Sequence, residues 1–260
     1  MIFDRFIALG DSMTEGMTDE IIDGNYRGWA DRVADVLATE TPKFTYVNLA
    51  VRGKLLKQVV EEQIPKALQF IEGKSTLVSF HAGANDVLRP NYKPEVSLPQ
   101  YELGIKQLTD AGATVIIFTV VDKVDGKGKT ADLWHQRFSA FNENVRAVAK
   151  KYPVILFEAK DAEFLNDRRF LAFDRLHMNA EGHRRLAQAV LAGLEKPYDK
   201  NWRDPLPPAK KKNKIVSGAI TFAWIITFVI PWIWRRIRGR SSGDGRSGKY
   251  ESPIHWPKRS

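Results

Sequence analysis

The sequence predicts an α/β protein in which helices cover both faces of a five-stranded parallel sheet. Short runs rich in β-branched and aromatic residues alternate along the chain with longer segments of helical periodicity. Such alternation produces βαβ units and therefore parallel strands. Two of the short runs, 115–118 and 154–157, are apolar without interruption, which is typical of strands buried on both faces.

Each expected strand ends at turn-forming or charged residues. The strands are Ile2–Leu9, Phe44–Leu49, Thr76–Phe80, Thr114–Val121 and Val154–Phe157. The expected helices are Trp29–Ala38, Leu55–Ile71, a stretch around Tyr101–Leu108, Phe138–Lys150 and Ala180–Leu194. In the first helix, Trp29, Val33 and Leu37 recur at the spacing of one buried face. Asn179 is placed to cap the last helix.

Composition divides the chain near residue 196. We expect a folded domain over 1–195, a Pro/Lys-rich extended linker over 196–214, a hydrophobic helix over 215–234 and a basic tail without fixed structure over 235–260. From residue 200 onward there are 14 Lys+Arg and 3 Asp+Glu, whereas residues 1–199 have 26 and 28. Because the body is nearly neutral, we expect it to bind no nucleic acid.

The absence of cysteine excludes a disulfide framework, a thiolate metal site and a cysteine nucleophile. No His/Asp/Glu cluster has the spacing of metal ligands, and we expect neither metal nor cofactor. The amino terminus enters a strand pattern without a basic leader or a long apolar core. This beginning favours a cytoplasmic catalytic domain over a secreted one.

Residues 10–16 read GDSMTEG and directly follow the first expected strand. Asp and Ser here could simply satisfy backbone groups in a turn. Alternatively, Ser12 is a nucleophile at the carboxyl edge of the sheet, where open α/β sheets bind ligands. A serine nucleophile needs a base, and that base works better when a carboxylate orients it.

His177 is the histidine best placed to be this base. It lies on the loop before the last helix, three residues after Asp174, so one loop can present both side chains at the sheet edge. The alternative is that Asp174 only satisfies backbone groups near a helix start. His183, which two arginines follow, is expected to be a solvated surface residue.

Acyl transfer also needs donors for the developing oxyanion. Gly53 follows the second strand and Asn85 the third, although each is also compatible with an ordinary turn or helix cap. A doubly wound sheet brings all such strand ends to one edge. This coincidence of Ser12, Gly53, Asn85 and the Asp174–His177 pair favours the catalytic interpretation.

Four ordered blocks resemble those of the SGNH, or GDSL-type, hydrolases over about residues 4–195. The blocks are Gly10–Asp11–Ser12, Gly53, Gly83–Ala84–Asn85–Asp86 and Asp174–Arg175–Leu176–His177. Met13 stands where the family name has Leu. The resemblance implies a flavodoxin-like three-layer α/β/α fold and a serine hydrolase that cleaves esters.

By this resemblance Ser12 is the nucleophile, His177 the base and Asp174 its orienting partner. The oxyanion donors are the backbone N–H groups of Ser12 and Gly53 and the side chain of Asn85. The expected partner is a small-molecule ester, either a lipid or an O-acylated small molecule. Carbohydrate O-deacetylation, thioester hydrolysis and an inactive binding module remain alternatives, and the sequence does not predict an oligomeric state.

Ile215–Trp234 is a run of 20 residues without a charge, long enough to span a bilayer. Lysines precede it and arginines follow it. With the body in the cytoplasm, spanning would send the arginine-rich end across, against the positive-inside tendency. A helix in the membrane plane avoids this problem. We expect membrane contact through this segment, and spanning, in-plane and body-docked arrangements remain open.

Overall fold

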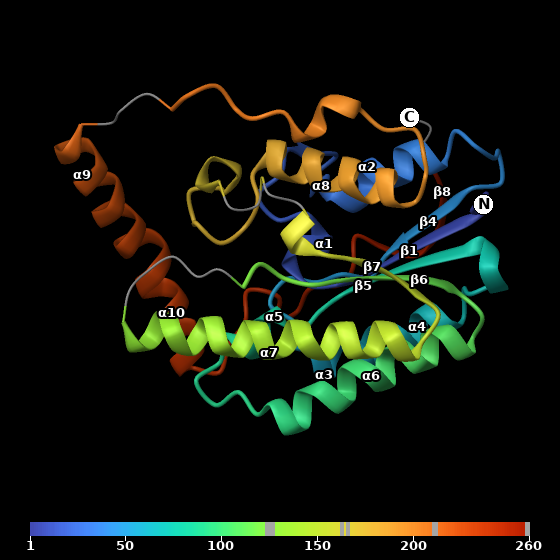
Figure 1. Cartoon of the computed structure of the whole chain (residues 1–260), viewed down its shortest axis with the longest axis horizontal. Coiled ribbons are helices and arrows are strands. Elements are labelled where there is room, and N and C mark those ends of the chain that lie inside the picture. Colours follow the sequence, from blue (N-terminus) through green and yellow to red (C-terminus); the bar gives the residue numbers. More distant parts are fainter. Residues whose placement is uncertain (123–127, 162–163, 165–166, 210–212, 258–260) are drawn as a thin grey trace.

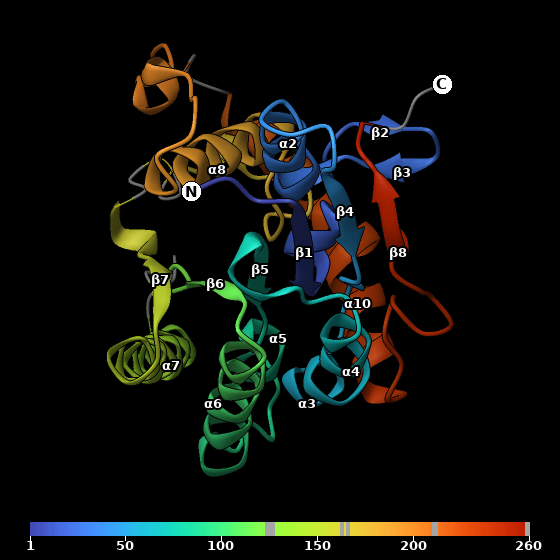
Figure 2. The same cartoon turned by 90° about the vertical axis from the view of Figure 1, so that its right-hand side faces the viewer.

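The computed structural model describes residues 1–122, 128–161, 164, 167–209 and 213–257. Within these residues, six strands form the central sheet in the order β7-β6-β5-β1-β4-β8 (Figures 1 and 2). The five expected strands are present and parallel. They are β1 (Arg5–Gly10), β4 (Thr45–Asn48), β5 (Thr76–His81), β6 (Thr114–Phe118) and β7 (Val154–Phe157). The strand order reverses between β1 and β5, where doubly wound sheets bind ligands.

Helices cover both faces of the sheet, which confirms the three-layer prediction (Figure 1). One face carries α2 (Gly28–Leu37) and α8 (Ala180–Gly193). The other face carries α3 (Leu56–Gln58), a π-helical turn (Val59–Gln63), α4 (Ile64–Leu68), α6 (Pro94–Asp110) and α7 (Lys129–Lys151). Trp29, Val33 and Leu37 are buried on one face of α2, and Asn179 caps α8, as expected.

Several short elements connect the main strands and helices. They are α1 (Ser12–Glu15), β2 (Ile21–Ile22), β3 (Asn25–Tyr26), α5 (Ala84–Val87) and 3-10 turns at Gly73–Ser75, Ala159–Asp161 and Arg168–Phe170. The strands β2 and β3 form a separate hairpin outside the main sheet. The turns α1 and α5 directly follow β1 and the β5 strand end, so they place their residues at the carboxyl edge.

The sixth strand is β8 (Tyr250–His255), which pairs antiparallel with β4. The expectation that 235–260 has no fixed structure is therefore wrong for this segment. Tyr46 of β4 packs its ring against Tyr250 and Trp256, with centroids 5.6 and 5.1 Å apart. β8 also covers the edge of β4, whose backbone groups would otherwise lack strand partners on that side.

The expected linker is partly folded onto the body. A 3-10 turn at Lys200–Arg203 carries Trp202, which is 4% exposed and packs against Phe164 and Phe170. Lys196 forms an ion pair with Glu40 at 2.7 Å. Within the described part of this segment, residues 196–199, 204–209 and 213 have no regular secondary structure, and residues 210–212 lie outside the described residues.

A helical segment connects the linker to β8. It comprises α9 (Lys214–Trp224), a π-helical turn (Ile225–Val229) and α10 (Ile230–Ile237), here called the apolar helix. In Figure 1 it crosses the end of the molecule toward which the parallel strands run. By length and composition, Val216–Arg235 could cross a membrane, and none of its most apolar stretch is fully buried.

Candidate active site

Ser12 is the first residue of α1, the single helical turn that follows β1. Asp11 caps this turn, because its Oδ1 accepts a hydrogen bond from the Met13 N–H at 3.2 Å. Gly10 has φ +144°, and a Cβ there would lie 2.2 Å from the His81 carbonyl oxygen. Only glycine therefore lets β1 and β5 end this close together. Ser12 is left at the reversal of strand order with 7% of its surface exposed.

His177 lies between Ser12 and Asp174. Its Nε2 is 2.9 Å from Ser12 Oγ, and its Nδ1 is 2.6 Å from Asp174 Oδ2. The other carboxylate oxygen, Oδ1, accepts the backbone N–H groups of Leu176 and His177 at 3.0 Å each. Because a carboxylate only accepts, Nδ1 carries the proton, and Nε2 is the acceptor facing the serine hydroxyl.

The charge of Asp174 depends on these bonds. Burial raises the pKa of its carboxyl, but the hydrogen bond and charge of His177 and the two backbone N–H groups outweigh burial and lower the pKa overall. The carboxylate is therefore ionised at neutral pH. An ionised Asp174 both fixes the ring of His177 and stabilises a positive charge on it.

Asn85 lies in α5, and its Nδ2 donates to Asp11 Oδ2 and to the Lys54 carbonyl oxygen, each at 3.1 Å. Its amide is thus held beside the residue that precedes Ser12. Burial raises the pKa of Asp11 to about 6, against the lowering effects of the Met13 N–H and the His177 charge. Asp11 is still ionised at neutral pH and remains an acceptor for Asn85.

Gly53 lies on the loop after β4, with φ +73°. Glu15 ties this loop to α1, because its carboxylate accepts the Arg52 N–H at 2.6 Å and pairs with the Arg52 guanidinium. A Cβ at Gly53 would lie 2.1 Å from Ser241 Oγ, so the carboxyl-terminal segment covers this glycine. The sequence did not predict this contact, because residues 235–260 were expected to have no fixed structure.

A pocket of about 920 Å³ opens beside the serine. Ser12, Asn85 and His177 line it, whereas Asp174 and Gly53 do not. Much of its wall is aromatic, from Phe118, Trp134, Phe138, Phe157 and Trp224. Among the described residues no group of three or more His, Asp or Glu side chains is arranged to hold a metal ion. The pocket therefore presents a serine and a histidine to a space lined by aromatic side chains and by charged ones, among them Glu158, Asp161 and Arg203.

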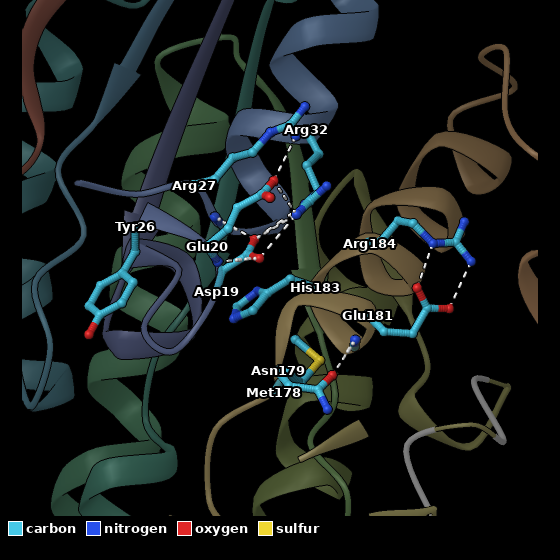
Figure 3. Close-up of polar contacts among 12 residues, drawn as sticks. Asp19, Glu20, Tyr26, Arg27, Arg32, Met178, Asn179, Glu181, His183 and Arg184 are labelled. Atoms are coloured by element: carbon cyan, nitrogen blue, oxygen red, sulfur yellow. Dashed lines mark hydrogen bonds and ion pairs between the residues drawn. The ribbon is translucent and has the colours of Figure 1, made fainter. Parts of the chain in front are cut away.

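His183 is buried, so the expectation of a surface residue is wrong. Figure 3 shows it beside the Asp19–Arg32 ion pair, and its Nε2 donates to the Met17 carbonyl oxygen at 3.1 Å. Burial lowers the pKa of His183 to about 4. The sequence did carry a signal, since His183 shares helical spacing with the buried residues Ala187 and Val190.

Known proteins are similar to this chain in sequence and in fold. A family model for the GDSL-like lipase/acylhydrolase family matches residues 8–185. No curated protein sequence matches the chain. Among solved structures, the acetylxylan esterase Axe2 from Geobacillus stearothermophilus is similar, with a TM-score of 0.60, 18% identity, and 73% of this chain and 93% of Axe2 covered.

Two further structures are similar at comparable levels. LAE5, an alpha/beta hydrolase enzyme from the metagenome of Lake Arreo in Spain, has a TM-score of 0.57 and 20% identity, with 74% of this chain and 94% of LAE5 covered. A lipolytic protein of the G-D-S-L family from Veillonella parvula has a TM-score of 0.55 and 19% identity, with 72% and 96% covered. These likenesses show the fold, and the family match spans more than half of the chain. The protein is thus a member of the GDSL-like lipase/acylhydrolase family, whose enzymes hydrolyse esters.

Proposed function

We propose that the protein cleaves carboxylic esters through an acyl-enzyme on Ser12. The observation that carries this proposal is the line of hydrogen bonds from Ser12 Oγ through His177 to Asp174, at 2.9 and 2.6 Å. A base in contact with the hydroxyl, itself held by a carboxylate, is the arrangement that activates a serine.

The reaction proceeds in two halves. His177 Nε2 takes the Ser12 proton as Oγ forms a bond to the ester carbonyl carbon, and the same proton passes to the alcohol as the ester C–O bond breaks. His177 then takes a proton from water, whose oxygen forms a bond to the acyl carbon. The proton passes from His177 to Ser12 Oγ as the acyl–Oγ bond breaks, which releases the acid and restores Ser12. The backbone N–H of Ser12 and one N–H of Asn85, both from residues that line the pocket, serve as oxyanion donors. The backbone N–H of Gly53, on a loop that does not line the pocket, is the third candidate donor.

The preferred substrate is a lipid ester or another O-acylated small molecule with an apolar acyl group. The size of the pocket and its aromatic wall support this choice, since apolar walls gain from burying acyl carbons. A second candidate is carbohydrate O-deacetylation, which the similarity to the acetylxylan esterase Axe2 favours. Contact with a membrane through Ile215–Trp234 would bring lipid esters to the enzyme.

The test compares full-length protein and its Ser12→Ala variant on p-nitrophenyl acetate, butyrate and octanoate, in detergent. We expect hydrolysis that the variant loses, with a preference for the longer acyl chains if the aromatic wall binds them. Preference for acetate alone would favour the deacetylase. A serine-directed phosphonate should label the wild type and not the variant. Absence of both labelling and hydrolysis in a folded protein would support an inactive binding module.

A further inference from the structure

The chain returns to the body after the apolar helix. β8 pairs with β4, with Thr45 opposite His255 and Tyr46 opposite Ile254. A helix that crosses a bilayer leaves its two ends on opposite sides, separated by about 30 Å of hydrocarbon. Residues 1–209 precede the apolar helix and β8 follows it, so the helix cannot span a membrane while β8 remains in the sheet.

Buried polar contacts and close packing hold the segment after the apolar helix on the body. Lys249, directly before β8, donates to backbone carbonyls at 26–27 and to Asp31 Oδ1, at 2.7 to 2.9 Å. Both charged side chains of this pair are 3–4% exposed. Gly243 lies so close to Arg52 that a Cβ there would meet the Arg52 carbonyl oxygen at 1.9 Å. Releasing β8 would leave a buried charge unpaired, which is costly.

One face of the apolar helix docks on the loop that carries the catalytic pair. Trp224 Nε1 donates to the Asp174 carbonyl oxygen at 2.9 Å. The Arg175 guanidinium donates to Thr221 Oγ1 at 3.0 Å and lies 4.5 Å from the Trp224 ring centre. Trp224 also lines the pocket. The apolar helix therefore forms part of the pocket wall next to His177.

The opposite face of the helix is apolar and exposed. Its large side chains include Phe222, Ile226, Ile230, Ile233 and Trp234, which are 44–65% exposed. Residues 205–243 contain eight Lys or Arg and no Asp or Glu, with the charges grouped at the two ends of the helix. An exposed apolar stripe between basic ends matches a bilayer surface with anionic headgroups.

We propose that the apolar helix lies in the plane of an anionic membrane surface, with its outer face in the lipid and its inner face on the catalytic loop. The body and β8 then remain on one side of the bilayer, and the pocket wall formed by Trp224 lies next to the lipid. The membrane position itself does not depend on the proposed function. The entry of lipid esters into the pocket from the membrane does rest on it.

The first test is co-sedimentation of full-length protein with phosphatidylcholine vesicles, with and without phosphatidylglycerol. We expect binding to the anionic vesicles that weakens with salt. The double variant Ile226→Asp/Ile230→Asp should lower binding at least ~10-fold, because two isoleucines are lost from the face that would enter the lipid. A matched control, Val96→Asp/Leu103→Asp, changes two exposed apolar residues of α6 and should bind as the wild type does.

The same experiment with Ser12→Ala separates this inference from the proposed function, since vesicle binding needs no catalysis. Equal binding to neutral and anionic vesicles, or none to either, overturns the inference. The apolar face could instead bind a second copy of the chain. In that case the wild type would be a dimer by sedimentation, the Ile226→Asp/Ile230→Asp variant a monomer, and neither would bind vesicles.

Sidedness is tested with single cysteines, which the cysteine-free chain permits. Ser75→Cys marks the body and Ser247→Cys marks the segment after the apolar helix. In intact cells and in inverted membrane vesicles, a membrane-impermeant maleimide should label both positions or neither. Labelling of only one of them would establish that the helix spans the membrane.

Discussion

The amide nitrogen of Asn85 donates to two acceptors, Asp11 Oδ2 and the Lys54 carbonyl oxygen. To serve an oxyanion, one N–H has to turn from these groups toward the substrate. Asn85→Ala should therefore lower kcat about 10²–10³-fold and change KM little, because the bond to the oxyanion is stronger in the transition state. Steady-state hydrolysis of a p-nitrophenyl ester gives both constants.

The control for Asn85→Ala is Asn201→Ala, which removes an exposed amide outside the pocket and should keep wild-type kinetics. Equal activity of Asn85→Ala and wild type would mean that the amide only positions Asp11 and the Lys54 loop.

His183 makes the stability depend on pH. The pKa of His183 is about 4 in the folded protein, against an ordinary value of 6.5. As the pH falls, the unfolded chain therefore binds a proton at this ring before the folded protein does. The neutral ring contributes fully to the free energy of unfolding above pH 6.5. This contribution, about 3 kcal/mol, is lost as the pH falls toward 4. His183→Gln can keep a donor for Met17 and should flatten this part of the profile.

The measurement is the free energy of unfolding in urea from pH 8 to 4.5, for wild type and His183→Gln. The difference between the two proteins at pH 8 reports packing alone and serves as the baseline. Asp11 and Asp31, with pKa values raised to about 6 by burial, act in the opposite direction in both proteins and cancel in the difference. A constant difference across the range would contradict the prediction.

At the residue scale, much of the site could be predicted, because Ser12, Asn85 and His177 follow strands or precede a helix in a doubly wound chain. The hydrogen bonds of Asn85 could not be predicted, since one acceptor is the carbonyl oxygen of Lys54, which no sequence pattern indicates. The prediction for His183 is wrong because its two arginine neighbours indicated a solvent-exposed position. Those arginines are instead held by Glu181.

Among the elements, we expect β8 to depend on Lys249 more than on any surface ion pair. Lys249→Ala would leave Asp31 buried and two carbonyls without their donor, and we expect a loss of about 3–5 kcal/mol in the free energy of unfolding. The matched control is Lys66→Ala. Lys66 also joins the body to this segment, through Glu251 at 2.7 Å, but both partners are exposed. Its loss should cost at most ~1 kcal/mol.

The Lys249 network also leads toward Ser12. Tyr46 donates to Asp31 at 2.8 Å, and Asn48 Nδ2 donates to Tyr46 Oη at 2.9 Å and to the Thr14 carbonyl oxygen at 3.2 Å. Thr14 belongs to α1. We therefore expect Lys249→Ala to reduce kcat as well as stability, whereas Lys66→Ala should leave both near wild type. Equal unfolding free energies for the two variants would refute the special role of Lys249.

The five parallel strands could be predicted because each is a local apolar run between turn residues. β8 could not, because its sequence, YESPIH, is polar and contains a proline. Its strand form depends on an edge supplied by β4, which is far away in the sequence. Composition predicted the apolar helix. Whether it spans the membrane, lies in the membrane plane or docks on the body could be decided only from the position of β8.

On the scale of the whole molecule, the body is not complete at residue 195. Removing residues 209–260 would uncover β4, leave Asp31 without Lys249 and take Ser241 away from Gly53. A protein of residues 1–208 should therefore unfold at lower urea concentration and hydrolyse even a soluble ester more slowly than the full chain. The full-length Ile226→Asp/Ile230→Asp variant is the control, because it disables only the outer face of the apolar helix and should keep both properties. If 1–208 matched the full chain in both, the return of the chain through β8 would be dispensable, and the case against a spanning helix would lose its basis.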